Sequence, residues 1–219
     1  MGELQKAEVR KIAKEIGLNT ADKKDSQGLC FIGKVKLPVF LQQQLAPKEG
    51  KVIEIPAGYN EYTYKDTAIE TLCKPYSHKE TAGEKVGNHN GAHYYTIGQR
   101  KGLNIGGTTE PLFVIDTDTN SNIIYTGQGE NHPGLYRKGL FVASKDIHQT
   151  REDLALKNGK SKAFLCRIRY RQELTKATFH KKEDGIYVIF DQPQRGITPG
   201  QFIAWYLKDE LIGSGVING

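Results

Sequence analysis

The 219-residue sequence lacks long apolar runs and has few cysteines. Because no stretch is apolar over the roughly 20 residues that a membrane-spanning helix needs, we expect no membrane partner. The first residues are charged and lack the apolar centre of a secretory signal, which favours a cytoplasmic protein. Cys30, Cys73 and Cys166 are an odd number of cysteines at wide spacing, so we expect a reducing compartment rather than a disulfide framework.

Basic residues outnumber acidic residues. The sequence has 31 lysines and arginines against 25 aspartates and glutamates, which gives a formal net charge of +6. Such a surplus suits a polyanionic partner such as nucleic acid. It is also an ordinary way to keep a protein soluble, so charge alone leaves both interpretations open.

The pattern changes early in the chain from helical to β. Residues 5–16 place apolar side chains at helical spacing, and Gly17 is a common helix stop. Residues 37–45 predict a second short helix with Pro38 in its first turn. Residues 51–55 alternate as a strand does, and the chain beyond them is rich in threonine, tyrosine, valine and isoleucine between glycine or asparagine turns.

The later strands predict a small closed barrel. Residues 113–125 fit a hairpin around a polar turn. Six further strands follow at residues 139–143, 163–171, 175–179, 186–190, 202–206 and 210–217. We therefore expect a mainly β fold: a short helical N-terminal remnant, a small central α+β/β module and a C-terminal six-stranded-type β-barrel. The expected domain ranges are residues 1–35, 36–108 and 109–219.

The strand expected at residues 163–171 separates apolar residues from arginines. Alternation gives one face Phe164, Cys166, Ile168 and Tyr170, and the other face Arg167, Arg169 and Arg171. Cys166 is therefore expected in the core. The arginines would form a ladder with steps of about 7 Å, comparable to the phosphate spacing of a nucleic-acid strand. The alternative is a solvated outer face of the barrel.

A single cysteine, Cys30, lies between two glycines in residues 25–33. Four nearby basic residues favour its thiolate, the reactive form: Lys23, Lys24, Lys34 and Lys36. Gly28 and Gly33 leave room for a close approach. The alternative is a small apolar residue that packs beside its neighbours Phe31 and Ile32.

Four motifs occur in order along the chain: KDSQGLCFIGK at residues 24–34, YYTIGQRKGL at 94–103, RIRYR at 167–171 and TPGQ at 198–201. Together they resemble the bacterial tRNA-specific 2-thiouridylase family, and the resemblance covers residues 4–215. It implies an enzyme, a tRNA-uridine 2-sulfurtransferase. Such an enzyme forms 2-thiouridine at the wobble uridine of tRNA with ATP and a cysteine persulfide.

The resemblance implies one catalytic residue, which carries the persulfide, and three tRNA contacts: Cys30, and Arg169, Tyr170 and Gln201. The loop at residues 98–102 adds Arg100 and Lys101, whose charges could pair with RNA phosphates. The alternative at this loop and at residues 198–201 is a tight turn with solvated side chains.

The resemblance also implies parts that this sequence lacks. In the family, ATP and Mg²⁺ bind an N-terminal ATP-pyrophosphatase domain that opens with a glycine- and serine-rich phosphate loop, and no such loop occurs here. We therefore expect residues 1–35 to be the end of that domain, no cofactor to bind this chain, and the chain to be inactive alone. The family's second cysteine, which forms a transient disulfide, matches neither Cys73 nor Cys166. A sulfur-relay protein is the implied persulfide donor.

Two other interpretations compete. One is a non-catalytic RNA-binding module with a translation-factor-like β-barrel, in which Cys30 is only buried. The other is a zinc site, for which the candidate ligands are Cys73, His78, His89 and His93. Only the last two approach the paired spacing of zinc ligands, so we expect no metal. Residues 59–87 are interpreted as an insertion, and the remaining histidines, His132, His148 and His180, as surface residues.

Overall fold

The computed structural model describes residues 3–23, 45–64, 66–170 and 172–218. The chain forms two compact units, Met1–Ala46 and Pro47–Gly219. Cys30 and the helix expected at residues 37–45, apart from its last residue, lie outside the described residues. None of the helices that the structure describes has both the length and the apolar character needed to cross a bilayer.

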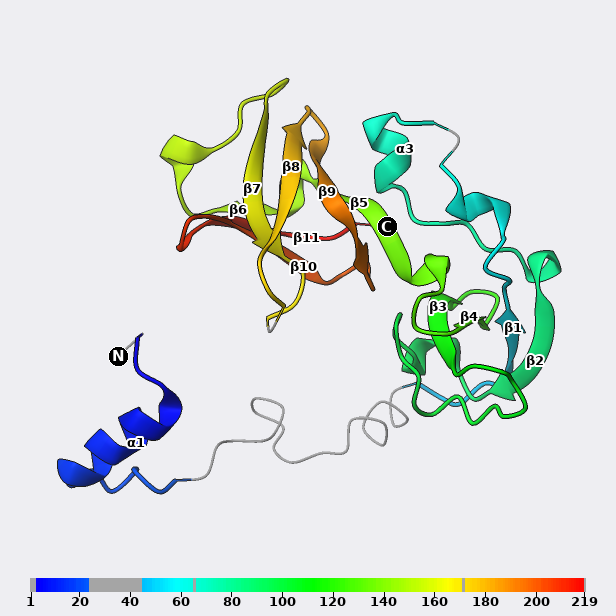
Figure 1. Cartoon of the computed structure of the whole chain (residues 1–219), viewed down its shortest axis with the longest axis horizontal. Coiled ribbons are helices and arrows are strands. Elements are labelled where there is room, and N and C mark those ends of the chain that lie inside the picture. The colour runs from blue at the N-terminus through cyan, green and yellow to red at the C-terminus, as the bar shows by residue number, and fades with distance from the viewer. Residues whose placement is uncertain (1–2, 24–44, 65, 171, 219) are drawn as a thin grey trace. The chain divides into compact units, whose positions relative to one another are not determined.

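The N-terminal unit contains the first expected helix, α1 (Lys6–Glu15) (Figure 1). The backbone N–H of Gln5 donates to Glu8 Oε2 at 2.8 Å, which caps the first turn. Gly17, with φ of 72°, follows the last turn, as expected of a helix stop. No residue of α1 is buried, so its apolar stripe is exposed within this unit.

The second unit begins with a four-stranded sheet in the order β2-β1-β4-β3 (Figure 1). Its strands are β1 (Gly50–Glu54), β2 (Glu84–His89), β3 (Leu112–Asp118) and β4 (Ile123–Gln128). β1 is parallel to β4 and antiparallel to β2, and β3 forms the expected hairpin with β4. Both faces of the sheet are covered, because neighbouring residues such as Val52 and Ile53 belong to different apolar clusters.

The domain boundary expected at residues 108–109 precedes two strands that belong to the first sheet. β3 and β4 complete the first sheet instead of starting the barrel, since Val52 of β1 pairs with Ile124 of β4. The two sheets are joined instead by residues 129–135, which contain a short 3₁₀ helix. The turn of the sequence predicts the hairpin. It does not predict which sheet the hairpin joins, because that depends on the pairing of β4 with β1, some 70 residues earlier in the chain.

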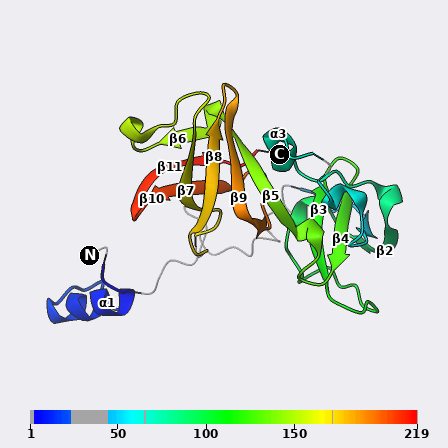
Figure 2. The same cartoon turned by 45° about the horizontal axis from the view of Figure 1, so that its top comes forward.

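The rest of the unit is a curled seven-stranded sheet in the order β5-β9-β8-β7-β10-β11-β6. Its strands are β5 (Tyr136–Ala143), β6 (Ile147–Gln149), β7 (Ser161–Arg167), β8 (Thr175–Lys181), β9 (Gly185–Arg195), β10 (Phe202–Leu207) and β11 (Glu210–Val216). Phe141 of β5 forms a bridge with Asn218, just past β11, so the sheet meets itself (Figure 2). The mainly β fold and its C-terminal barrel are confirmed; among the barrel strands that the structure describes β6 was not foreseen, and in the first sheet β2 was not foreseen.

The interior of the barrel is filled by alternating apolar side chains of its strands. Phe164, Phe179 and Trp205 pack there with ring centroids 5.3 Å apart in successive pairs. Cys166 is fully buried beside them, as expected, and burial raises the pKa of its thiol to about 12. It is therefore a packing residue and not a reactive thiol.

Short helices connect the strands of the second unit: α3 (Ile69–Cys73), η1 (Asn60–Tyr62), η2 (Glu80–Ala82), η3 (Ala92–Tyr94), η4 (Pro133–Leu135), η5 (Ser144–Asp146) and η6 (Glu152–Leu154). The segment interpreted as an insertion is well packed, because α3 lies against β5 and β9. Cys73, at the end of α3, is buried, and its Sγ lies 3.7 Å from the carbonyl oxygen of Val188. Burial raises the pKa of this thiol to about 12.

His132 was expected at the surface, but only 4% of it is exposed. Its Nε2 lies 3.1 Å from the carbonyl oxygen of Ile55, and its Nδ1 accepts the N–H of Gly134 at 3.2 Å. The ring therefore carries its proton on Nε2 and is neutral, in agreement with the pKa, which burial lowers. Gly127 makes room for it, since a Cβ there would lie 2.5 Å from the ring.

The four candidate zinc ligands do not form one cluster. His78 contacts Asp116, His89 contacts Asn122, and Cys73 is packed against the barrel strands. In the part of the chain that the structure describes, no group of three or more histidines, cysteines or carboxylates could hold a metal ion.

Candidate functional site

Three of the residues expected to contact tRNA, Arg169, Tyr170 and Gln201, line one groove of about 650 Å³ on the outside of the barrel. The groove is formed by the end of β7, the connection from β7 to β8, and the start of β10. These segments are adjacent because β7 and β10 are paired, with Arg167 opposite Ala204. The full lining is Arg167, Ile168, Arg169, Tyr170, Gly200, Gln201, Phe202, Ala204 and Tyr206.

Tyr170 reaches this groove because β7 ends earlier than expected, at Arg167. Beyond the strand, the N–H of Gln172 donates to the carbonyl oxygen of Arg169 at 3.1 Å, and its side chain accepts the N–H of Ile168. This turn carries Tyr170 out of the core, and 88% of it is exposed. The expectation that Tyr170 shares the buried face with Ile168 is therefore wrong, since alternation ends with the strand.

The expected ladder of three arginines is replaced by two differently held guanidinium groups, and Arg171 lies outside the described residues. The Arg167 guanidinium lies 5.0 Å above the Tyr206 ring and donates to the carbonyl oxygen of Tyr170 at 3.1 Å. Arg169 Nη2 donates to the carbonyl oxygen of Gly196 at 3.2 Å. Within the described ranges neither forms an ion pair, so their positive charge is not neutralised.

Gln201 is fixed by backbone hydrogen bonds to Ile217, the residue just past β11. Gly200, with φ of 82°, donates its N–H to the carbonyl oxygen of Ile217 at 2.9 Å, and Ile217 donates to that of Gln201 at 2.7 Å. The tight turn foreseen at residues 198–201 is therefore present. The turn also aims Gln201 into the groove, and its Oε1 is buried without a hydrogen-bond partner.

The loop that carries Arg100 and Lys101 is anchored to β3. Gly98 donates its N–H to the carbonyl oxygen of Val114 at 2.7 Å, and Val114 donates to that of Gln99 at 2.9 Å. Arg100 and Lys101 are exposed beyond this anchor, and no ion pair is found for either in the described part of the chain. Both expected phosphate contacts are thus accessible.

The two loops approach one another between the sheets. Ile97, from the loop on β3, and Pro199, from the turn before β10, line the same small cavity of about 50 Å³. Arg137 of β5 lines it as well. The five residues expected to contact RNA therefore lie on three segments: the loop anchored to β3 carries Arg100 and Lys101, the β7–β8 connection carries Arg169 and Tyr170, and the turn before β10 carries Gln201. The first and the last of these segments meet at the junction. Sequence reasoning gave no sign of this convergence, because it depends on how the two sheets pack.

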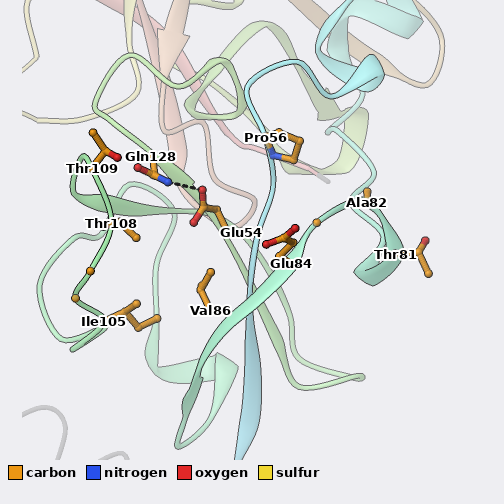
Figure 3. Close-up of a pocket in the computed structure, with 13 residues that line it drawn as sticks. Glu54, Pro56, Thr81, Ala82, Glu84, Val86, Ile105, Thr108, Thr109 and Gln128 are labelled. Carbon is orange, nitrogen blue, oxygen red and sulfur yellow. Dashed lines mark hydrogen bonds between the residues drawn. The ribbon is translucent and has the colours of Figure 1, made fainter.

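A second hollow, of about 680 Å³, lies on the first sheet and has the opposite charge (Figure 3). Glu54 and Glu84, which pair across β1 and β2, both line it, and Gln128 Nε2 donates to Glu54 Oε1 at 2.6 Å. Thr108 and Thr109 lie on its far side. Two carboxylates repel phosphate, so this hollow is a poor place for RNA.

Comparison with known proteins matches three family models to the chain. Residues 75–128 match the tRNA methyl transferase PRC-barrel domain, and residues 137–217 match the aminomethyltransferase beta-barrel domain. Residues 1–34 match the tRNA methyl transferase HUP domain. The first of these matches ends just before the junction between the two sheets, and the second begins just after it.

Curated relatives named tRNA-specific 2-thiouridylase MnmA align with the whole chain. The protein from Christiangramia forsetii is 58% identical over 225 residues, and that from Flavobacterium johnsoniae is 56% identical over 225 residues. In both cases the alignment covers 100% of this chain and 57% of the relative. The Karelsulcia muelleri protein is 48% identical, over 100% of this chain and 56% of its own length. This chain, which spans little more than half the length of these relatives, belongs to the tRNA-specific 2-thiouridylase family.

Proposed function

We propose that this chain is the tRNA-recognition part of a tRNA-uridine 2-sulfurtransferase and also carries its persulfide cysteine. The observation that supports recognition most directly is the groove in which Arg169, Tyr170 and Gln201 converge. Unpaired guanidinium groups suit RNA phosphates, and exposed aromatic rings suit unstacked bases. Arg100 and Lys101 extend the basic surface across the junction, so that one tRNA touches both sheets. We place the protein in the cytoplasm, where its tRNA substrate is found.

Replacing Arg100 and Lys101 by alanine is expected to weaken tRNA binding without affecting the fold, because both side chains are exposed and form no ion pair with the described residues. Each lost phosphate contact should lower the slope of log Kd against log salt by about 1. Fluorescence anisotropy with labelled tRNA over a salt series measures this slope. Arg169→Ala and Gln201→Ala should weaken binding from the other side of the junction.

The matched control is Lys176→Ala, which removes an exposed lysine from the outside of β8, away from the groove. Lys176→Ala removes one charge and the Arg100 and Lys101 variant removes two, so a loss for Lys176→Ala about half as large as that of the double variant would mean that only net charge matters, which contradicts a defined surface. Wild-type protein that binds no tRNA would contradict the recognition role altogether.

Cys30 is proposed as the sulfur carrier. Its thiolate attacks the sulfane sulfur of a persulfide on a relay protein, the donor cysteine leaves as a thiolate, and Cys30 then holds the persulfide. ATP with Mg²⁺ would supply the adenylate that makes the uridine C2 oxygen a leaving group. We assign that step, and the second cysteine that releases the sulfur, to the portion of the longer relatives that this chain does not span. The chain is accordingly expected to be inactive alone.

Incubating the chain with a cysteine-derived persulfide donor should add one sulfur atom to Cys30, as measured by mass spectrometry of the intact chain and its peptides. Cys30→Ala should remove the adduct. Cys73 and Cys166 serve as internal controls, because burial raises the pKa of both thiols to about 12 and keeps them protonated. Labelling of these two instead of Cys30, or thiolation of tRNA by this chain with ATP, would contradict the assignment.

A further inference from the structure

The outer face of β10 presents aromatic side chains where a polar face would be expected. Ile203 and Trp205 point into the core and are at most 2% exposed. Phe202 points outward, and 60% of it is exposed. Tyr206 lies on the same outer side and lines the same groove. Neither ring fills the core, and both line one groove, which is the arrangement expected of a binding surface.

Ala204 makes the groove between these rings possible. It lies between Phe202 and Tyr206 on the outer side of β10, and all three line the groove. A larger side chain at this position would fill the space between the two rings. The groove of about 650 Å³ is in the size range of small-ligand sites.

The charge of the groove selects its ligand. The described residues that line the groove include Arg167 and Arg169 but no aspartate or glutamate. The Arg167 guanidinium is held 5.0 Å above the Tyr206 ring, so a cation and an aromatic face are presented together. Proteins usually bind single-stranded nucleic acid with aromatic rings that stack on the bases and with cations that neutralise the phosphates.

We propose that this groove binds one unpaired nucleotide of an RNA, with its base stacked on Phe202 and its phosphate facing Arg167 and Arg169. The inference rests on the proposed tRNA recognition and specifies it, because bases inside a duplex have both faces covered and cannot stack on a side chain. It assigns roles to Phe202 and Ala204, which the sequence motifs did not single out, and it places Arg167 of the expected arginine ladder beside them. The barrel thereby recognises a loop or a splayed end of the RNA rather than a helical stem.

The test compares two labelled probes of equal charge. One is an oligoadenylate of about ten nucleotides, within the range that such grooves contact, and the other is an abasic ribose-phosphate oligomer of the same length. Phe202→Ala should weaken oligoadenylate binding roughly 5-fold to 150-fold, as expected for loss of one stacked base, and leave abasic binding unchanged. Ala204→Leu should give a similar loss by filling the groove. Binding is measured by fluorescence anisotropy.

Ala163→Leu is the matched control for Ala204→Leu, because Ala163 is an exposed alanine on the outside of β7 that does not line the groove. It should bind both probes as the wild type does. If Phe202→Ala binds oligoadenylate normally, or weakens both probes equally, the stacking role is wrong while tRNA recognition stands. Wild-type protein that binds neither probe nor tRNA overturns the recognition role itself.

Discussion

Phe179→Ala should lower the free energy of unfolding by about 3–5 kcal/mol, the range for removal of a fully buried aromatic side chain. Phe179 is 0% exposed, and its ring centroid lies 5.3 Å from those of both Phe164 and Trp205. The change removes these contacts and leaves a cavity at the centre of the barrel. Because a domain of this kind is stable by about 5–15 kcal/mol in total, the loss would be a large part of its stability.

Urea unfolding followed by tryptophan fluorescence measures this effect at the site itself, because Trp205 is the single tryptophan of the chain. Phe202→Ala is the matched control: it makes the same substitution in β10, where 60% of the side chain is exposed. It should cost less than about 1 kcal/mol, as most surface substitutions do. Similar losses for the two variants would show that the barrel core is not packed around Phe179.

The barrel could be predicted because each of its main strands alternates between apolar and polar residues. Trp205 and Phe179 occupy the interior positions that this alternation gives them. β6 escaped prediction because Ile147–Gln149 is too short to show a period and exists only through its pairing with β11. Period-based reasoning thus finds long strands and misses those that a neighbour creates.

The candidate site was predictable as a set of residue types but not as a surface. The motifs indicated Arg169, Tyr170 and Gln201, yet their convergence in one groove depends on the β7 and β10 pairing and on the early end of β7. Phe202 was missed, although alternation with Ile203 in the same strand already placed it on the outer side. An aromatic residue on the outer side of a predicted strand is the signal that would have found it.

His132 and Arg137 show why buried polar residues are hard to foresee. Both are at most 6% exposed. Each makes a hydrogen bond to a backbone carbonyl group far away in the sequence, in place of the hydrogen bond that it would make to water at the surface. Nothing in the local pattern reveals such a partner, and polar residues are mostly found at the surface. Those distant hydrogen bonds offset part of the cost of burial.

Arg137 is held at the junction between the two sheets. Its Nη2 donates to the carbonyl oxygen of Cys73 at 2.6 Å, while its Nε is buried without a protein partner. Burial lowers its pKa, although an arginine remains charged at neutral pH. The adjoining cavity of about 50 Å³ is lined mainly by apolar residues but also by His78 and Asp116, and it has room for a water molecule, so we expect ordered water to satisfy Nε there.

Arg137→Ala should therefore destabilise the second unit by about 3 kcal/mol or more. The Cys73 carbonyl loses its donor, which costs about 1–3 kcal/mol when the group stays buried, and loss of the packed side chain adds a cavity term. Arg137→Met retains most of the packing and removes the donors, so it should lose less. Urea unfolding of the wild type and both variants measures the difference, and a loss below about 1 kcal/mol for Arg137→Ala would contradict this account.

Arg137→Ala should also weaken the binding of an RNA that contacts both the loop carrying Arg100 and the turn carrying Gln201. Ile97 and Pro199 both line the Arg137 cavity, so we expect its collapse to change the distance between the loop that carries Arg100 and the turn that carries Gln201. A tRNA that spans both loops should bind Arg137→Ala more weakly, whereas a short oligoadenylate that occupies only the barrel groove should bind unchanged at temperatures where the variant is folded. Equal weakening of both ligands would show that Arg137 supports the barrel rather than the spacing of the loops.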